Sequence, residues 1–224
     1  MLTKIKPAIA LVITDKETNA QIKSSGADVL ELRVDLFSSL DLPYIVKQIQ
    51  QRRLLKIPLL LTVRNQQKEG ARKTFADNRK WAIFQESVPL VDMVDIELSS
   101  PLLKRVITLA CQHHKKIIVS AHDFKRTPDN LESIVTKAKK AGADIVKIAS
   151  HANTWDDVLA MLLFTHHHRQ TPLITMSLGK IGAVSRVLFP AFGSCYTYTF
   201  LNKPTASGQI PVQKLKSLLK FCYQ

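Results

Sequence analysis

One lysine stands inside an otherwise apolar run, where its type and place could support covalent chemistry. The run covers residues 145–149, and Lys147 is the charged residue within it. Lysine is rarely buried without a partner. Burial and nearby arginine side chains would favour the neutral amine, which is the form that attacks ketones. A structural role, in which Lys147 pairs with Glu31 or Glu97, is compatible with the same sequence.

Three charged residues alternate with apolar ones in an earlier run, residues 29–35. Glu31, Arg33 and Asp35 share one face by the two-residue period of a strand, and the residues between them are leucine and valine. If the apolar face packs on helices, the charged face points into the interior, where opposite charges can pair. The alternative is a half-exposed strand with its polar face in water.

Further polar side chains come at the ends of apolar runs or just beyond them. His122 ends the run 117–122, and Arg64 ends the run 58–64. Histidine exchanges protons near neutral pH, which suits His122 to acid–base work. The loops near the end of the chain offer Arg186, which could hold a carboxylate with two N–H groups.

Eight short apolar runs recur along the chain, and stretches with helical spacing or helical caps lie between most of them. The runs are residues 8–13, 29–35, 58–64, 93–98, 117–122, 145–149, 173–177 and 195–201. The expected helices are 41–54 with Asp41 as cap, 73–87, a helix opened by Thr127 and Pro128 and stopped at Gly142, 155–167 capped by Thr154, and a last helix from Pro211.

Alternation of strands and helices predicts an α/β fold with parallel strands and crossover helices. Eight such units favour a single (β/α)8 TIM barrel, in which the active site lies at the C-terminal ends of the strands. An open doubly wound sheet is the alternative, but residues 12–15 lack the glycine-rich first turn that is usual there. The length of 224 residues fits one catalytic barrel domain, residues 1–224.

Composition narrows the class of partner. The formal net charge of +14 fits either a polyanion or basic helix faces with an anionic substrate. The basic residues are spread along the chain without a nucleic-acid-binding motif, so we predict a small anionic substrate and no nucleic acid. The longest apolar runs are far too short to cross a membrane, and three widely spaced cysteines fit a reducing compartment, so we predict a cytoplasmic protein with no membrane partner.

Two clusters that imitate metal sites are discounted. The side chains of His166, His167 and His168 follow one another on a helix, point in different directions and cannot converge on one ion. The cysteines have no metal-ligand spacing. We therefore predict neither a metal nor another cofactor.

Taken together and in order, these motifs resemble type I 3-dehydroquinase. The segments that carry the resemblance are Glu31-Leu32-Arg33-Val34-Asp35, Thr62-Val63-Arg64, Ser120-Ala121-His122-Asp123-Phe124, Val146-Lys147-Ile148-Ala149, Met176-Ser177-Leu178-Gly179, Ser185-Arg186 and Ala206-Ser207-Gly208-Gln209. The resemblance implies a cofactor-free hydro-lyase of the shikimate pathway, commonly a homodimer. It would convert 3-dehydroquinate to 3-dehydroshikimate by a Schiff-base-mediated syn elimination of water.

The resemblance also implies a role for each matching residue. Lys147 would form the imine with the C3 ketone, and His122 would assist imine formation and breakdown and carry protons. The remaining side chains would bind substrate: Glu31, Arg33 and Arg64 the ring hydroxyls, Arg186 and Gln209 the carboxylate and a neighbouring hydroxyl, and Thr205, with Ala206, would lie in a lid over the site.

Some residues depart from the family pattern. Glu69 lies five residues after Arg64, where the family's glutamate lies four after, so either Glu69 orients His122 through a loop with one extra residue, which is the assignment we adopt, or the role is lost. The other departures are Ser207 in place of a proline, Leu178 in place of a second methionine, and Tyr198 in place of a phenylalanine.

Two other functions are compatible with parts of the sequence. A class I aldolase would share Lys147, but it would usually need a phosphate site late in the barrel. A basic binding module would explain the charge and would predict salt-sensitive binding of RNA, but it gives no reason for a lysine inside a strand.

Overall fold

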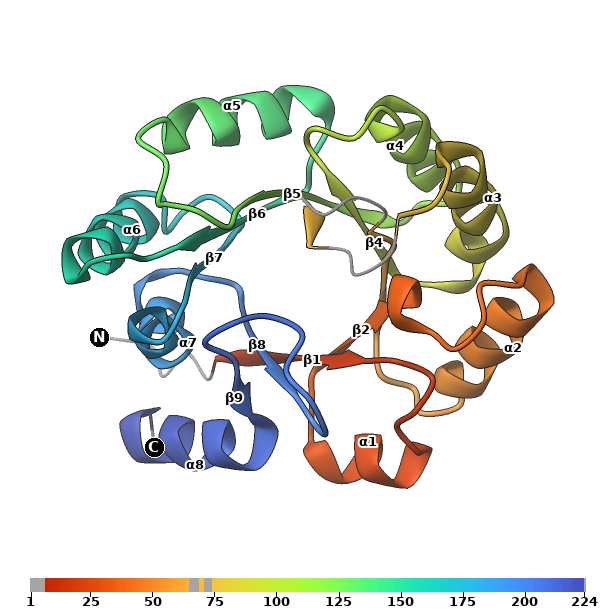
Figure 1. Ribbon diagram of the computed structural model, residues 1–224, viewed down its shortest axis with the longest axis horizontal. Coiled ribbons are helices and arrows are strands. Elements are labelled where there is room, and N and C mark those ends of the chain that lie inside the picture. Colours follow the sequence, from red (N-terminus) through yellow and green to blue (C-terminus); the bar gives the residue numbers. More distant parts are fainter. Residues whose placement is uncertain (1–6, 65–68, 71–73, 224) are drawn as a thin grey trace.

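The computed structural model describes residues 7–64, 69–70 and 74–223, and within them parallel strands alternate with helices along the chain (Figure 1). The strands are β1 Ala8–Ile13, β2 Val29–Arg33, β3 Leu59–Thr62, β4 Met93–Glu97, β5 Lys116–Asp123, β6 Ile145–His151, β7 Leu173–Leu178 and β8 Tyr196–Phe200. Each matches one of the eight runs that the alternation of apolar residues predicted, with small differences at the ends.

The sheet curls into the predicted (β/α)8 barrel. Its strands pair in parallel in the order β7-β6-β5-β4-β3-β2-β1-β8, and a two-residue strand, β9 (Ile210–Pro211), pairs with β8. The ring closes between β7 and β8, where Leu173 and Ser194 form a parallel bridge. The N–H of Cys195 donates to the carbonyl of Leu173 at 2.7 Å in the same place.

Helices surround the strands on the outside of this ring (Figure 1). They are α1 Asn19–Ser25, α2 Leu42–Arg53, α3 Asp77–Ser87, α4 Leu103–Gln112, α5 Leu131–Ala141, α6 Trp155–His167, α7 Ser185–Leu188 and α8 Val212–Tyr223. Short 3-10 turns follow β2 (Val34–Leu36), precede β4 (Val88–Leu90) and flank α7 (Ile181–Val184 and Phe189–Phe192). In the part of the chain that is described, no helix combines the length and the apolar character that a membrane span requires.

Two helix ends lie where the capping residues in the sequence predicted them. Thr154 accepts from the backbone N–H of Asp157, whose carboxylate accepts in return from the backbone N–H of Thr154, and this capping box starts α6 as predicted. Gly142 ends α5 with a φ of 106°, a left-handed conformation that glycine adopts without strain.

Three predicted helix starts were wrong. The helix expected from residue 73 begins at Asp77, and residues 74–76 are not helical. Thr127 does not cap α5, because its hydroxyl donates to the carbonyl of His151 at 3.2 Å and the helix starts only at Leu131. Pro211 belongs to β9, and α8 starts one residue later.

The two faces of the strands have different surroundings. Leu30, Leu32 and their counterparts on other strands pack against the helices in the larger apolar cluster. Inside the barrel, Leu60, Met93 and Ile118 form an apolar floor at the N-terminal end of the strands. The inward positions two residues further along those strands are polar, so the barrel interior changes from apolar to charged toward its C-terminal mouth.

Candidate active site

A cavity opens at the C-terminal ends of the strands, where the fold predicts the site. All nine predicted site residues line this cavity: Glu31, Arg33, Arg64, Glu69, His122, Lys147, Arg186, Thr205 and Gln209. The other lining residues are Thr62, Gly70, Phe124, Ala149, Met176, Leu178, Tyr198 and Ala206. Residues 65–68, between Arg64 and Glu69 in the sequence, lie outside the described residues.

Lys147 lies deep in this cavity and is 4% exposed. Its Nζ is 3.0 Å from a carboxylate oxygen of Glu31 and 3.1 Å from one of Asp95, and it lies 4.3 Å from the centre of the Tyr198 ring. Burial alone would lower the pKa of Lys147, but the carboxylates of Asp95 and Glu31 outweigh it and hold this pKa above its ordinary value. Of the two alternatives that the sequence left open for Lys147, the pairing with Glu31 is present, and the carboxylates of Asp95 and Glu31 favour its ammonium form over the neutral amine.

The two carboxylates that hold Lys147 are themselves fixed by further contacts. Glu31 accepts from the hydroxyl of Thr62 at 3.0 Å. Asp95 accepts from Arg64 at 2.7 Å and from the hydroxyl of Ser120 at 2.7 Å. Burial would raise the pKa of Asp95, but Arg64 and Lys147 hold it well below the usual range. Asp95 is a site residue that the sequence prediction left out, although the alternation within residues 93–97 places it on the inward face.

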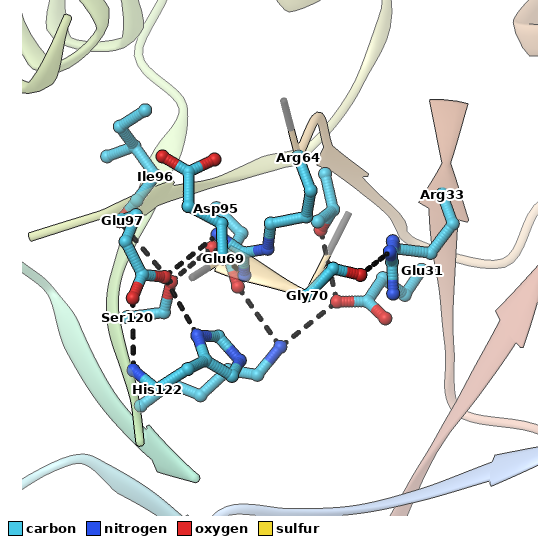
Figure 2. A network of polar contacts seen from close by, with 12 residues as sticks. Glu31, Arg33, Arg64, Glu69, Gly70, Asp95, Ile96, Glu97, Ser120 and His122 are labelled. Carbon is cyan, nitrogen blue, oxygen red and sulfur yellow. Dashed lines mark hydrogen bonds and ion pairs between the residues drawn. The ribbon is translucent and has the colours of Figure 1, made fainter. Parts of the chain in front are cut away.

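His122 is held by Glu97. Its Nδ1 lies 2.8 Å from Oε2 of Glu97, and its backbone N–H donates to Oε1 at 3.0 Å (Figure 2). Oε2 of the same carboxylate also accepts from Ser120 at 2.9 Å and from Arg64 at 3.2 Å. Burial would raise the pKa of Glu97, but His122 and Arg64 hold it below its usual value.

The expectation that Glu69 orients His122 is therefore corrected. A carboxylate oxygen of Glu69 lies 2.9 Å from Nζ of Lys80, and both side chains are fully buried. Among the described residues, the hydrogen bond from His122 to a carboxylate runs to Glu97 and none runs to Glu69. Lys80 on α3 is a buried cation that requires a counter-charge, and Glu69 supplies it.

The strand register places His122 next to Lys147. Ser120 pairs with Lys147 across β5 and β6, and His122 pairs with Ala149, one inward position nearer the mouth. The imidazole is stacked on Phe124, with ring centres 5.8 Å apart. Two contacts, to Glu97 and to Phe124, thus fix the orientation of the imidazole beside Lys147.

Arg33 is fixed on the β2 side of the cavity. Its guanidinium binds Asp35 through two hydrogen bonds, Nε to Oδ1 at 2.9 Å and Nη2 to Oδ2 at 2.8 Å. Nη2 also donates to the carbonyl of Gly70 at 3.1 Å. The charged face predicted for residues 29–35 therefore points into the barrel and pairs there, as expected.

Arg186 differs from the other arginines of the site because it has no carboxylate partner among the described residues. It is 2% exposed, and Nη1 contacts the sulfur of Met176 at 2.9 Å, while Nε and Nη2 have no hydrogen-bond partner in the described part of the chain. Burial lowers the pKa of Arg186 to about 10, so the group is still a cation at neutral pH. A buried cation with unused donors is costly unless an anion joins it.

Gln209 organises the loop that follows β8. Its side-chain oxygen accepts from the backbone N–H of Thr205 at 2.7 Å and from that of Ala206 at 3.3 Å. Gly208 lies in the same loop with a φ of 78°, and a Cβ there would come within 2.4 Å of the carbonyl oxygen of Gly179. This loop and Arg186 line the same cavity. The side-chain amide N–H groups of Gln209 remain available to a bound molecule.

The cavity thus combines three chemical properties. Lys147 supplies an amine at the bottom of the cavity, among the carboxylates of Glu31 and Asp95. His122 supplies a proton acceptor and donor near it, and Arg186 supplies a positive charge without a carboxylate partner among the described residues. Glu31 and Arg64 add acceptors and donors for hydroxyl groups. This set fits a small molecule that carries a carboxylate, hydroxyls and an electrophilic carbon such as a ketone.

Comparison with known proteins gives a consistent result. The family model for type I 3-dehydroquinase matches residues 9–224. The 3-dehydroquinate dehydratase of Hydrogenobaculum sp. (strain Y04AAS1) is 35% identical over 219 residues, which are 96% of this chain and 98% of that protein. The crystal structure of the 3-dehydroquinate dehydratase from Aquifex aeolicus VF5 aligns with a TM-score of 0.83 at 34% identity and covers 97% of this chain and 99% of that one. The type I enzyme from Clostridium difficile, solved with covalently modified comenic acid, aligns with a TM-score of 0.86 at 29% identity over 97% of this chain and 92% of that one.

Proposed function

The chain belongs to the type I 3-dehydroquinase family, and we propose that it removes water from 3-dehydroquinate through an imine between Lys147 and the C3 ketone. It is accordingly a hydro-lyase of the shikimate pathway. The observation that carries the imine proposal is the position of Lys147, a buried lysine that lines the bottom of the cavity. Family membership favours dehydration over the cleavage of a sugar phosphate, which the lysine alone would also allow.

The ammonium of Lys147 must first lose its proton, because only the neutral amine attacks a ketone. Glu31 and Asp95 stabilise the charged form. A substrate whose ring hydroxyls bind Glu31 and Arg64 would compete for these carboxylates and weaken their hold on Lys147. His122 is placed to receive the proton, since it stands one inward position above Lys147 on the neighbouring strand.

Imine formation then follows with balanced steps. The amine nitrogen bonds to C3, the ketone oxygen becomes a hydroxyl, and this hydroxyl leaves as water after it gains a proton from His122. The protonated imine withdraws electrons from C2 and makes its hydrogen acidic. His122 removes this hydrogen as a proton, and the electron pair moves toward nitrogen to give an enamine.

Elimination returns the electrons to the ring. The enamine expels the C1 hydroxyl, which leaves as water after it accepts the proton that His122 holds. One imidazole can serve both positions only when proton and hydroxyl leave from the same face, so the proposal includes syn elimination. Water then hydrolyses the imine, releases 3-dehydroshikimate and restores Lys147.

The unpaired guanidinium of Arg186 supports binding of the substrate carboxylate. Its Nε and Nη2 donors form a two-pronged arrangement that matches carboxylate geometry. Arg33 and Arg64 are already held by Asp35, Asp95 and Glu97 and would act on ring hydroxyls as fixed donors. The amide nitrogen of Gln209 would add a donor from the loop.

The family resemblance also predicts a cytoplasmic homodimer. Trp155, Leu159 and Leu163 lie four residues apart on one side of α6 and are each about half exposed or more, at 63%, 52% and 48%. Sedimentation of the purified protein at micromolar concentration tests the dimer: a dimer mass supports it, and a monomer mass contradicts it.

Turnover of 3-dehydroquinate tests the proposed function. The wild-type protein should form the conjugated product, followed by its ultraviolet absorbance, and Lys147→Met should form none above background. Lys80→Met is the matched control, because Lys80 is also a buried lysine paired with a carboxylate. Loss of activity in both variants with loss of the fold would not support the assignment, so circular dichroism accompanies each assay. Full activity in a folded Lys147→Met protein would refute it.

A further inference from the structure

Tyr198 has a hydroxyl that no part of the described chain satisfies. The residue lies on the inward side of β8, is 2% exposed and lines the cavity. Its ring faces the ammonium of Lys147 at 4.3 Å, while its phenolic oxygen has no hydrogen-bond partner among residues 7–64, 69–70 and 74–223. Buried hydroxyls are nearly always hydrogen-bonded, so an unused one beside a cavity points to something that binds there.

The hydroxyl is not needed for the contact with Lys147. A phenylalanine ring would fill the same space and present the same face to the ammonium ion. Burial raises the pKa of Tyr198 above its ordinary value, so the phenol keeps its proton and can donate. Neither packing nor the cation–π contact therefore explains the oxygen.

Arg186 lines the same cavity and also has hydrogen-bond donors that no described residue satisfies. Its Nε and Nη2 are buried, and no described residue is their hydrogen-bond partner. The residue before Tyr198 links the two, because the hydroxyl of Thr197 donates to the backbone carbonyl of Arg186 at 2.7 Å. The phenol of Tyr198 is also the titratable neighbour that acts on the pKa of Arg186, which burial lowers to about 10. Three unused donors thus face one cavity from neighbouring elements.

We propose that the Tyr198 hydroxyl donates a hydrogen bond to the substrate carboxylate, beside the two donors of Arg186. The proposal rests on the proposed function and adds a binding residue to it. A carboxylate has lone pairs enough for all three donors. The C1 hydroxyl is a less suitable partner, because it must reach His122 on β5, whereas Tyr198 and Arg186 belong to β8 and α7.

The test uses Tyr198→Phe and two ligands that cannot form an imine. Quinate has an alcohol in place of the C3 ketone and keeps the carboxylate, and its methyl ester lacks the negative charge. Because a hydrogen bond to a charged group is involved, Tyr198→Phe should weaken quinate binding about 10- to 100-fold in calorimetric titration. The affinity for the ester, relative to wild type, should change much less.

A stability measurement separates this role from a structural one. Removing an unsatisfied buried hydroxyl should leave the melting temperature unchanged or raise it. Tyr196→Phe is the matched control, since Tyr196 is on the same face of β8 but at the other end of the barrel, away from the site cavity. It should leave quinate affinity unchanged.

The outcomes are distinguishable. An unchanged quinate affinity in Tyr198→Phe, or an equal loss for quinate and its ester, would overturn the proposal. A lower melting temperature with unchanged ligand affinity would show a structural hydroxyl and would also overturn it. The imine is tested separately, because Tyr198→Phe should still give a borohydride-trapped adduct on Lys147 at saturating 3-dehydroquinate. If the wild type gave no adduct, the proposed function itself would fail.

Discussion

Replacing Glu97 by glutamine tests whether this residue acts through His122. Oε2 of Glu97 accepts from His122, Ser120 and Arg64, and Oε1 accepts from the backbone N–H of His122. Glutamine has one oxygen and one NH2 group. Either placement of its amide therefore turns an N–H group toward another donor and leaves the imidazole without its carboxylate.

The contacts set the size of the effect. Each hydrogen bond to a buried charged group contributes about 1.5–3 kcal/mol. General acid–base catalysis by a positioned side chain contributes roughly 10²- to 10⁴-fold, and a misoriented His122 would lose much of it. We expect Glu97→Gln to lower kcat about 100-fold. KM should change less than kcat, because Glu97 does not line the cavity and Arg64, which it also contacts, keeps its shorter ion pair with Asp95.

A double-mutant cycle with His122→Ala tests whether Glu97 acts only through the histidine. If Glu97 only positions His122, the double variant should have a kcat within about threefold of His122→Ala alone. Glu69→Gln is the control, because Glu69 pairs with Lys80, and its effect should multiply with that of His122→Ala. Multiplying effects of Glu97→Gln and His122→Ala would show that Glu97 acts independently of the histidine.

Two other properties follow from the buried charges. Arg186→Leu should raise KM for 3-dehydroquinate about 100-fold or more, as loss of a two-pronged ion pair implies. It should not lower the free energy of unfolding in urea, because the removed guanidinium has no counter-charge; an unchanged KM would contradict the carboxylate assignment. The folded-state pKa values of Asp95 and Glu31 lie below their ordinary values, so the unfolded chain binds protons more readily. The stability that these groups contribute should be complete above about pH 5 and decline as the pH falls further toward the lowered values. Urea unfolding from pH 6 to 2 should show this decline in the wild type and a shallower one in Lys147→Met; equal slopes would contradict the role of Lys147 in lowering these pKa values.

The sequence was sufficient to predict the barrel, because the strands are buried on both faces and can therefore be recognised as apolar runs. It also located the site, since the C-terminal ends of parallel strands converge and charged residues at those ends must meet. Helix α1 was not among the predicted helices because only Ile22 and Ser25 of it are buried. The capping box at Thr18 and Gln21 was the signal that could have found it.

The pairing of charges could not be predicted in the same way. Lys147 meets Glu31 and Asp95, which are 116 and 52 positions away in the chain, and only the closed barrel brings them to 3.0 and 3.1 Å. The sequence left open whether Lys147 is a neutral amine or pairs with Glu31 or Glu97, because it could not weigh carboxylates against burial. Glu69 and Glu97 were likewise both available to His122, and the demand of Lys80 for a counter-charge decided between them.

Borohydride trapping is the most direct test of the imine on Lys147. The protein is incubated with 3-dehydroquinate, reduced with borohydride, and examined by mass spectrometry as the intact chain and as peptides. We expect one substrate- or product-sized adduct on the peptide that contains Lys147, present in Lys80→Met and absent in Lys147→Met. A folded, active protein that gives no adduct, or an adduct on another lysine, would contradict it.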